Sequence, residues 1–217
     1  CEHADMLQQA QIWCQLALDG VWLAAVGVSA LADQLAQQLR SFGFTVHELQ
    51  SPAQQAGVVN AYAEPCNLGV DRWLALLAAR QHIKGSALLV DAGTAMTLDV
   101  LGADGVHQGG LIIPGLRMMR SSLHSNTQLL PEVEGGNWQL GAGTQEAIAA
   151  GTLGALVSVV ESVYAQQAKI SAGLACVITG GDAELVYNAL RPAVREHCKV
   201  DVDWLFKGLL VAAESAA

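Results

Sequence analysis

The sequence has few charged side chains, few aromatic rings and no concentration of basic residues. Charged residues make up 14% and aromatic residues 5% of the 217 positions, and the formal net charge is -9. Binding to nucleic acids or to anionic membranes depends on clustered Lys and Arg, so both kinds of partner are disfavoured. The chain also contains no apolar run of 18 or more residues, and therefore no membrane span is indicated.

Cysteines are also few and show no metal-binding pattern. The five cysteines are odd in number, and no pair has the C-x-x-C spacing of zinc and redox motifs. His197 and Cys198 are adjacent, but neighbouring side chains on one chain point in different directions. The sequence therefore predicts neither a disulfide framework nor a transition-metal site.

Apolar residues, in contrast, are abundant. They make up 52% of the chain, which is enough for a large core in one or two domains and leaves little of the sequence looking disordered. The acidic balance has a consequence for anionic ligands. A polyphosphate bound by such a protein has to be neutralised by backbone N–H groups and by bound cations.

Two glycine turns have the composition of phosphate-binding loops. Asp91-Ala92-Gly93-Thr94 and Thr179-Gly180-Gly181-Asp182 follow the apolar runs 87–90 and 175–178, so each is predicted to end a buried strand. Glycine lets the backbone approach an anion closely, and a nearby Asp can hold a cation that neutralises phosphate charge. A single turn of either kind is more often an ordinary turn than a phosphate-binding loop, so the prediction of a phosphate site depends on finding the two turns together.

A third segment, Gly69-Val70-Asp71-Arg72, carries a candidate base. A helical pattern continues from Arg72 to His82, which places Asp71 at a helix N-terminus, where the helix dipole stabilises a carboxylate. There Asp71 can accept a proton while Arg72 anchors an acidic substrate. On these residues alone, a helix N-cap is the better interpretation of Asp71, and surface solvation is the alternative for Arg72.

The spacing of apolar residues predicts alternating strands and helices. Strands are expected at 21–28, 44–49, 87–90, 97–100, from 106 onward and at 175–178, and helices at 29–39, 72–82, 116–123, 144–169, after 182 and after 204. The polar segment 5–18 is expected to be a helix or part of a hairpin. Leu116, Met119 and Leu123 share one helix face and are expected in the core, and Thr144 is expected to cap its helix.

Taken in order, these segments strongly resemble the type III pantothenate kinases. The resemblance is carried by G-V-D-R-W-L-A-L-L-A-A, V-D-A-G-T-A-M-T-L-D-V, H-Q-G-G-L-I-I-P-G-L-R-M-M-R-S-S-L and T-G-G-D-A, from about Gly57 to Gly208. That family belongs to the acetate and sugar kinase, Hsc70 and actin superfamily. The resemblance implies an α/β fold of two ribonuclease-H-like domains with mixed sheets flanked by helices. The domains are expected at 1–86 and 87–217, facing each other across a nucleotide cleft, with the last helix packing back on the first domain.

The resemblance also implies a reaction and its participants. The family phosphorylates the primary hydroxyl of pantothenate to 4'-phosphopantothenate with ATP, the first step of coenzyme A biosynthesis, as a cytoplasmic homodimer that uses Mg²⁺ and potassium or ammonium. Matching the family's motifs to this sequence makes Asp71 the general base and assigns pantothenate binding to Tyr62, Gly69, Val70, Arg72 and Thr144. The same match implies that Asp91 holds the monovalent cation and that Gly93 and Thr94 contact ATP. Gly180 and Gly181 are implied to lie near the adenosine.

One family motif does not occur in this sequence. Members begin with a D-x-G-N-[ST] turn that cradles ATP phosphates, and nothing like it precedes Gly57. By the family's spacing, a segment of about thirty residues is expected before Cys1. The chain is therefore expected to be a fragment whose isolated form binds ATP poorly.

Two other classes of function are alternatives to the kinase. A haloacid-dehalogenase-type phosphatase needs a second Asp two residues after the first, where this chain has Gly93. A non-catalytic regulatory or ligand-binding relative is the main alternative, and the intact Asp71, Arg72, Asp91 and Thr94 argue against it. An in-frame D-x-G-N-[ST] upstream of Cys1 would favour the kinase, and its absence would favour the binder.

The long helix predicted at 144–169 carries a stripe of small residues. Its members are Ala147, Ala150, Gly151, Gly154 and Ala155, which recur at helical spacing so that another backbone can approach closely. Internal packing explains the stripe as well as the homodimer face that the resemblance implies, and the sequence does not decide between them.

Overall fold

The computed structural model of the protein describes residues 20–26, 30–127, 130–131, 133 and 135–216. The segment 5–18, expected to be a helix or part of a hairpin, lies outside the described residues. Of the strand expected at 21–28, residues 27 and 28 also lie outside them, and residues 24–26 are not strand.

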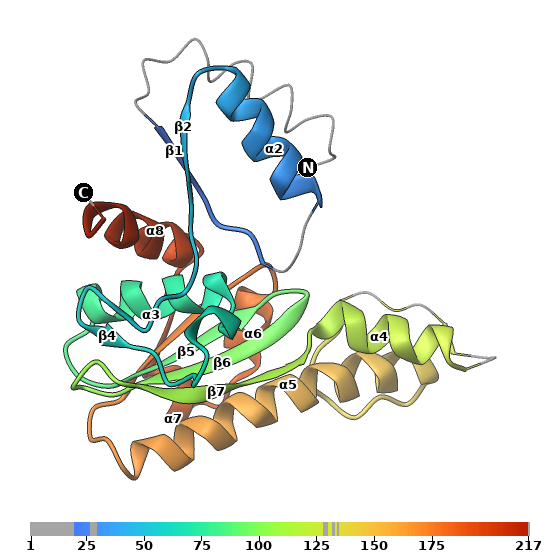
Figure 1. Ribbon diagram of the computed structural model, residues 1–217. Coiled ribbons are helices and arrows are strands. Elements are labelled where there is room, and N and C mark those ends of the chain that lie inside the picture. The colour runs from blue at the N-terminus through green and yellow to red at the C-terminus, as the bar shows by residue number, and fades with distance from the viewer. Residues whose placement is uncertain (1–19, 27–29, 128–129, 132, 134, 217) are drawn as a thin grey trace.

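A five-stranded mixed sheet forms the centre of the molecule, in the order β7-β6-β5-β8-β9 (Figure 1). The strands are β5 (Ala87–Ala92), β6 (Ala95–Leu101), β7 (His107–Pro114), β8 (Ala175–Thr179) and β9 (Cys198–Val200). β5, β6 and β7 are antiparallel neighbours, whereas β8 runs parallel to β5 and β9 parallel to β8. β5 lies in the middle of the sheet, and its continuous apolar run suits this position because both faces of the strand are buried.

Helices cover both faces of this sheet. Successive side chains of β5 point to opposite faces, so Leu88 and Val90 join one core and Ala87 and Leu89 join the other. The first core lies under α5 (Thr144–Ala168), α6 (Ala183–Ala189) and α7 (Pro192–Arg195), with α4 (Leu116–Ser125) beside α5. The second core lies under α3 (Val70–His82) and α8 (Trp204–Glu214).

The last helix, α8, is locked to α3 by a close backbone contact. A Cβ atom built on Gly208 would lie 2.0 Å from the carbonyl oxygen of Leu74, so only glycine fits at this crossing. Trp204, buried at the start of α8, donates its indole N–H to the carbonyl oxygen of Ala75 at 3.2 Å. The position of α3, which begins with Val70 and Asp71, therefore depends on α8.

A smaller unit at the beginning of the described chain extends away from the sheet (Figure 1). It consists of β1 (Gly20–Leu23) paired in parallel with β2 (Thr45–Glu48), with α2 (Ala30–Ser41) packed on them through Leu35 and Leu39. The short antiparallel pair β3 (Gln54–Gln55) and β4 (Val58–Val59) and the 3-10 turn η1 (Pro65–Asn67) then lead into α3.

The predicted α/β class with a mixed sheet flanked by helices is confirmed. Two local predictions are wrong. Gly143 and not Thr144 occupies the N-cap of α5, and no side chain caps that helix. Leu123 was expected in the core, but it is 37% exposed because its face of α4 borders an open groove. The predicted domain division after 86 separates α3 from the sheet on which α3 packs.

Among the described residues, one helix is long and apolar enough to cross a membrane. It is α5, whose most apolar stretch has a mean hydropathy of 1.6, and 61% of that stretch is buried inside the protein. The core helix of a folded domain meets the same criterion, so its composition is explained by the packing of α5 on the sheet.

Candidate active site

The two predicted glycine turns lie side by side at one end of the central strands. Asp91, near the end of β5, pairs with Thr179 at the end of β8. A Cβ atom built on Gly180, whose φ is +94°, would lie 2.4 Å from Oδ1 of Asp91 and 2.7 Å from the backbone of Ala92, so glycine is required there. The backbone N–H of Asp182 donates to the carbonyl oxygen of Ala92 at 2.9 Å.

A further turn, Pro114-Gly115, packs against the first of these turns. The N–H of Gly115 donates to the carbonyl oxygen of Thr94 at 2.9 Å, and a Cβ atom on Gly115 would lie 2.1 Å from the carbonyl oxygen of Gly93. A Cβ atom on Gly93 itself would make only ordinary contacts, because its nearest neighbour would be 3.4 Å away. The fold thus gathers three glycine turns around the end of β5.

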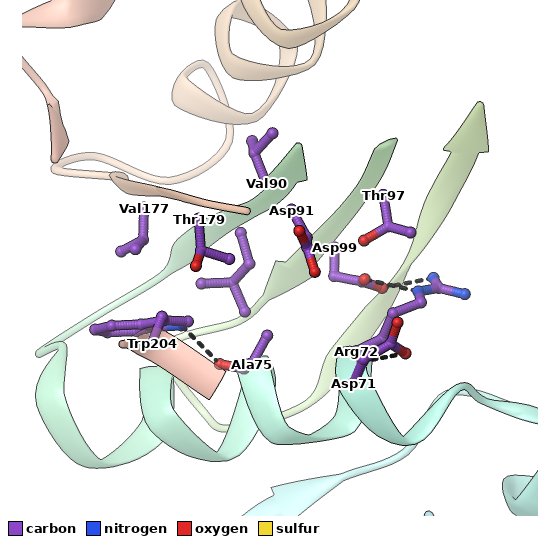
Figure 2. Close-up of a pocket in the computed structure, with 11 residues that line it drawn as sticks. Asp71, Arg72, Ala75, Val90, Asp91, Thr97, Asp99, Val177, Thr179 and Trp204 are labelled. Carbon is purple, nitrogen blue, oxygen red and sulfur yellow. Dashed lines mark hydrogen bonds and ion pairs between the residues drawn. The ribbon is translucent and has the colours of Figure 1, made fainter. Parts of the chain in front are cut away.

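A small pocket separates these strand ends from the first turn of α3, and Figure 2 shows Asp91 and Thr179 on the strands facing the helix that carries Asp71 and Arg72. Burial, and then the negative charge of Asp71, raise the pKa of Asp91 to about 6. Asp91 is therefore still mostly ionised at pH 7, and two carboxylates share the pocket.

Asp71 lies in the first turn of α3, as predicted, but it is not the N-cap. Gly69 occupies the cap position without a side-chain hydrogen bond, and Oδ1 of Asp71 accepts a hydrogen bond from the backbone N–H of Arg72 at 2.7 Å. Within the described chain, Oδ2 of Asp71 makes no hydrogen bond. One oxygen of the carboxylate is thus held in place and the other is free to accept a proton.

Arg72 is buried in an ion pair, so surface solvation, the alternative considered for it, is wrong. The guanidinium is 4% exposed, and its Nε and Nη2 donate to Oδ2 and Oδ1 of Asp99 at 2.8 and 2.6 Å. Its Nη1 donates to the hydroxyl of Tyr62 at 2.8 Å. Burial lowers the pKa of Arg72, but the hydrogen bonds and the negative charge of Asp99 outweigh burial and raise it overall.

Sequence reasoning missed Asp99 and the two residues that support it. His107 lies 2.8 Å from Oδ1 of Asp99 through its Nε2, and its ring stacks on that of Tyr62 with centroids 6.3 Å apart. Gly110 pairs with Asp99 across β6 and β7. The sequence does contain a signal for this cluster, which is the carboxylate of Asp99 inside the apolar strand 96–101. A buried charge requires a partner, so this carboxylate indicates that a cation lies next to it.

A larger cleft of about 940 Å³ collects most of the predicted substrate residues. Tyr62, Gly69, Val70, Asp71 and Arg72 are among the residues that line it. The small unit of β1, α2 and β2 and the segment after it also contribute to the lining, through Leu23, Ala25, Val26, Ala32, Asp33, Glu48, Leu49, Gln50 and Ser51. Asp71 and Arg72 belong both to this cleft and to the small pocket beside Asp91, so the two spaces meet at the start of α3.

Thr144 does not line this cleft in the same chain. It lines an apolar groove of about 850 Å³ between α4 and α5, together with Ala147, Gly151 and Ala155. The small-residue stripe is therefore divided. A Cβ atom on Gly151 would meet nothing within 4 Å, whereas one on Gly154 would lie 2.5 Å from Nε1 of Trp138. Gly154 is therefore packed internally against Trp138, whereas Gly151 has no such packing within the described chain.

The fold has counterparts among solved structures. A conserved Baf family protein from Campylobacter jejuni superposes with a TM-score of 0.58 at 18% identity, covering 95% of this chain and 88% of the other. The ethanolamine utilization protein EutJ from Carboxydothermus hydrogenoformans gives a TM-score of 0.51 at 12% identity, covering 99% of this chain and 75% of the other. These likenesses concern the fold alone.

Sequence comparison is more specific. A type III pantothenate kinase from Idiomarina loihiensis is 37% identical over 203 residues, covering 88% of this chain and 76% of the relative. One from Nitrosococcus oceani is 40% identical over 206 residues, covering 91% and 76%. The profile of the family described as type III pantothenate kinase matches residues 2–166. The chain therefore belongs to the type III pantothenate kinase family.

Proposed function

We propose that Asp71 takes the proton from the primary hydroxyl of pantothenate while that hydroxyl attacks the γ-phosphorus of ATP, giving 4'-phosphopantothenate and ADP. The observation that carries this proposal is the position of Asp71, which lines the large cleft and also lines the small pocket together with Asp91 of β5. Phosphoryl transfer depends mainly on positioning and charge neutralisation, so one base between the two substrates suffices. The reaction is tested by pantothenate-dependent release of ADP, with the product identified by mass spectrometry.

The cleft wall supports a division of roles among the predicted substrate residues. Gly69 and Val70 bring backbone to the cleft beside the base. The guanidinium of Arg72 is largely occupied by Asp99, so its effect on pantothenate passes in part through Tyr62. Gly93 and Thr94 would contact the phosphates of ATP.

The adenosine would lie near Gly180 and Gly181, on the other side of the same turns. A pocket of about 190 Å³ there is lined by Arg117, Arg120 and Asp182, among others. Asp182 directly follows Gly181, so the pocket adjoins the second glycine turn.

The small pocket fits hard cations. Asp71 and Asp91 contribute two negative charges, Thr97 and Thr179 contribute hydroxyl oxygens, and the one cation in the lining, Arg72, is already paired with Asp99. Oxygen-rich, negatively charged surroundings suit potassium or ammonium at Asp91, which would neutralise charge there. No group of three or more His, Cys, Asp or Glu in the described ranges could hold a metal ion, so Mg²⁺ would be held mainly by the ATP phosphates.

We expect the reaction to need Mg²⁺ and, separately, potassium or ammonium. Replacing sodium by potassium at constant ionic strength should raise kcat/KM about tenfold or more, because Asp91 would then hold a cation beside the phosphates. Asp91→Ala should remove the difference between the two buffers. Asp104→Ala, which removes an exposed carboxylate from the turn after β6, should keep it. Equal rates of the unmodified enzyme in sodium and potassium would contradict the proposed cation role.

We also propose that two copies of the chain associate through the groove between α4 and α5. The groove exposes large apolar side chains, with Met118 at 44% and Leu123 at 37%, beside the open small residues of α5. Exposed apolar surface of this kind is typical of subunit interfaces. Thr144 lies at the start of the same helix, so association would bring it to the pantothenate site of the partner subunit.

The dimer proposal predicts a specific effect at Gly151. Gly151→Leu adds side-chain volume to the open half of the stripe, so it should produce a monomer with an unchanged helical circular dichroism spectrum and reduced activity. Ala165→Leu, on an exposed part of the same helix outside the groove, is the matched control and should remain a dimer. Size-exclusion chromatography with light scattering measures the result. A Gly151→Leu enzyme that remained a fully active dimer would place the interface elsewhere.

Two further proposals concern architecture and location. The unit of β1, α2 and β2 and the unit built on the central sheet would be the two ribonuclease-H-like halves, dividing near residue 86, with α3 at their junction. Use of ATP in coenzyme A synthesis supports a cytoplasmic location.

A further inference from the structure

The hydroxyl of Tyr62 has a defined direction of hydrogen bonding. A phenol can accept hydrogen bonds and has a single proton to donate. The one hydrogen bond that this hydroxyl makes within the described part of the chain is accepted from Nη1 of Arg72 at 2.8 Å. Its proton is therefore not used by the protein there, and Tyr62 lines the substrate cleft.

Two buried residues fix the guanidinium that sets this direction. Asp99, 2% exposed, receives two parallel hydrogen bonds from Arg72, a geometry that fixes the plane of the guanidinium. His107 is buried against the same carboxylate through Nε2, and its Nδ1 has no partner among the described residues. A carboxylate oxygen accepts hydrogen bonds, so the ring donates to Asp99 from Nε2.

Gly110 provides the space for this arrangement. It lies opposite Asp99 on the neighbouring strand β7. A Cβ atom there would lie 2.2 Å from the backbone carbonyl oxygen of Leu98, 2.4 Å from Oδ1 of Asp99 and 2.5 Å from Nη2 of Arg72, so any other residue would displace both the neighbouring strand and the ion pair. The position thus needs glycine because β6 and the buried ion pair both lie close to its Cα, and not for an unusual backbone conformation.

We propose that Asp99, His107 and Gly110 are positioning residues that hold Arg72 so that the Tyr62 hydroxyl accepts from the protein and donates its proton to a carbonyl or carboxylate oxygen of the substrate. The cation that donates to the phenol oxygen also polarises the O–H bond and strengthens it as a donor. This inference rests on the proposed placement of pantothenate in the cleft.

A double-mutant cycle in the full-length enzyme tests the proposal. Tyr62→Phe and Asp99→Asn should each raise KM for pantothenate about tenfold, leaving kcat within about threefold and KM for ATP unchanged. Because Asp99 acts through Tyr62, adding Asp99→Asn to Tyr62→Phe should raise KM no further. An additional tenfold rise in the double variant, or an unchanged KM in Asp99→Asn, would overturn the proposal.

Glu161→Gln is the matched control for loss of a buried carboxylate. Glu161 is 3% exposed and is bound to the backbone N–H and Nε of Arg191 at 2.7 and 2.6 Å, among the helices on the opposite face of the sheet. Its substitution should lower the melting temperature without changing KM for pantothenate. If Glu161→Gln raised KM for pantothenate as much as Asp99→Asn does, loss of stability would explain both effects and the proposal would be overturned.

Variants of His107 keep the test decisive if Asp99→Asn fails to fold. His107→Gln retains a donor near the position of Nε2, whereas His107→Phe keeps a ring beside Tyr62 and removes the donor. KM for pantothenate should rise in His107→Phe and be largely restored in His107→Gln, and equal KM values in the two variants would contradict the inference. An unmodified enzyme without pantothenate-dependent turnover would instead remove the proposed function itself.

Discussion

Asp71→Asn is expected to lower kcat for pantothenate phosphorylation about 10²- to 10⁴-fold, the usual cost of removing a general base. Asparagine has nearly the same shape and keeps an oxygen to accept the hydrogen bond from the N–H of Arg72, which is 2.7 Å long in the native chain. It cannot take up a proton at neutral pH. KM for pantothenate and the melting temperature should therefore change little.

The control for this variant is a carboxylate at another helix N-terminus. Asp203 is exposed at the N-cap of α8 and lines neither the cleft nor the small pocket, so Asp203→Asn should leave turnover unchanged. Steady-state kinetics with pantothenate and ATP varied separately measure both variants. Turnover of Asp71→Asn within tenfold of the unmodified enzyme would remove Asp71 as the base.

The second large effect is expected at Gly208. Gly208→Ala places a methyl group about where the carbonyl oxygen of Leu74 now lies, since the built Cβ is 2.0 Å from it. The two helices have to separate, which should cost about 3 kcal/mol and lower the melting temperature by about 6–12 °C. Because α3 carries Asp71 in its first turn, kcat/KM should fall as well.

Gly151→Ala is the comparison for this effect. Gly151 is also inside a helix, but a Cβ atom there meets nothing within 4 Å. Alanine has the higher helix propensity and adds only one methyl group, far less volume than the leucine expected to separate the subunits, so this substitution should be neutral or stabilising by about 0.5–1 kcal/mol. Differential scanning calorimetry of both variants measures the difference. A Gly208→Ala protein as stable as Gly151→Ala would show that α8 and α3 are not held at backbone contact in solution.

The sequence predicted the parts of the site that are encoded locally. Strand β5 and the turn at Asp91 are visible because an apolar run ends directly in a glycine turn, and the helix after Arg72 is visible from its periodicity. The helices α5 and α8 were found within a residue of their observed starts. Short elements such as α7 and β9 were missed, because four and three residues contain too little of any repeat.

The buried cluster around Arg72 was not predictable in the same way. Its charges come from α3 and β6, which are far apart in sequence, and only the pairing of β6 with β7 places Gly110 opposite Asp99. An isolated Arg in a sequence gives no sign that its partner lies in a later strand. The sequence therefore offered only an acidic substrate or solvent as the partner of a guanidinium that is among the most buried charged groups of the described chain.

The small-residue stripe shows a different limit. Helical spacing places Ala147, Gly151 and Gly154 on one side of α5, but it does not say what covers each of them. Trp138 packs on Gly154 from the segment before the helix and leaves Gly151 open. A side chain outside the helix thus decides which half of the stripe is buried, and the periodicity of the helix sequence alone cannot predict this.

The contact between α8 and α3 also has a consequence for the nascent chain on the ribosome. The helix that carries the proposed base ends at His82, whereas the helix that covers it begins at Trp204. At a synthesis rate of about 5–20 residues per second, the second helix is made roughly ten seconds after the first. Until then, the face of α3 that receives α8 lacks this helix, so the native contact that fixes α3 can form only after the residues of α8 have been synthesised.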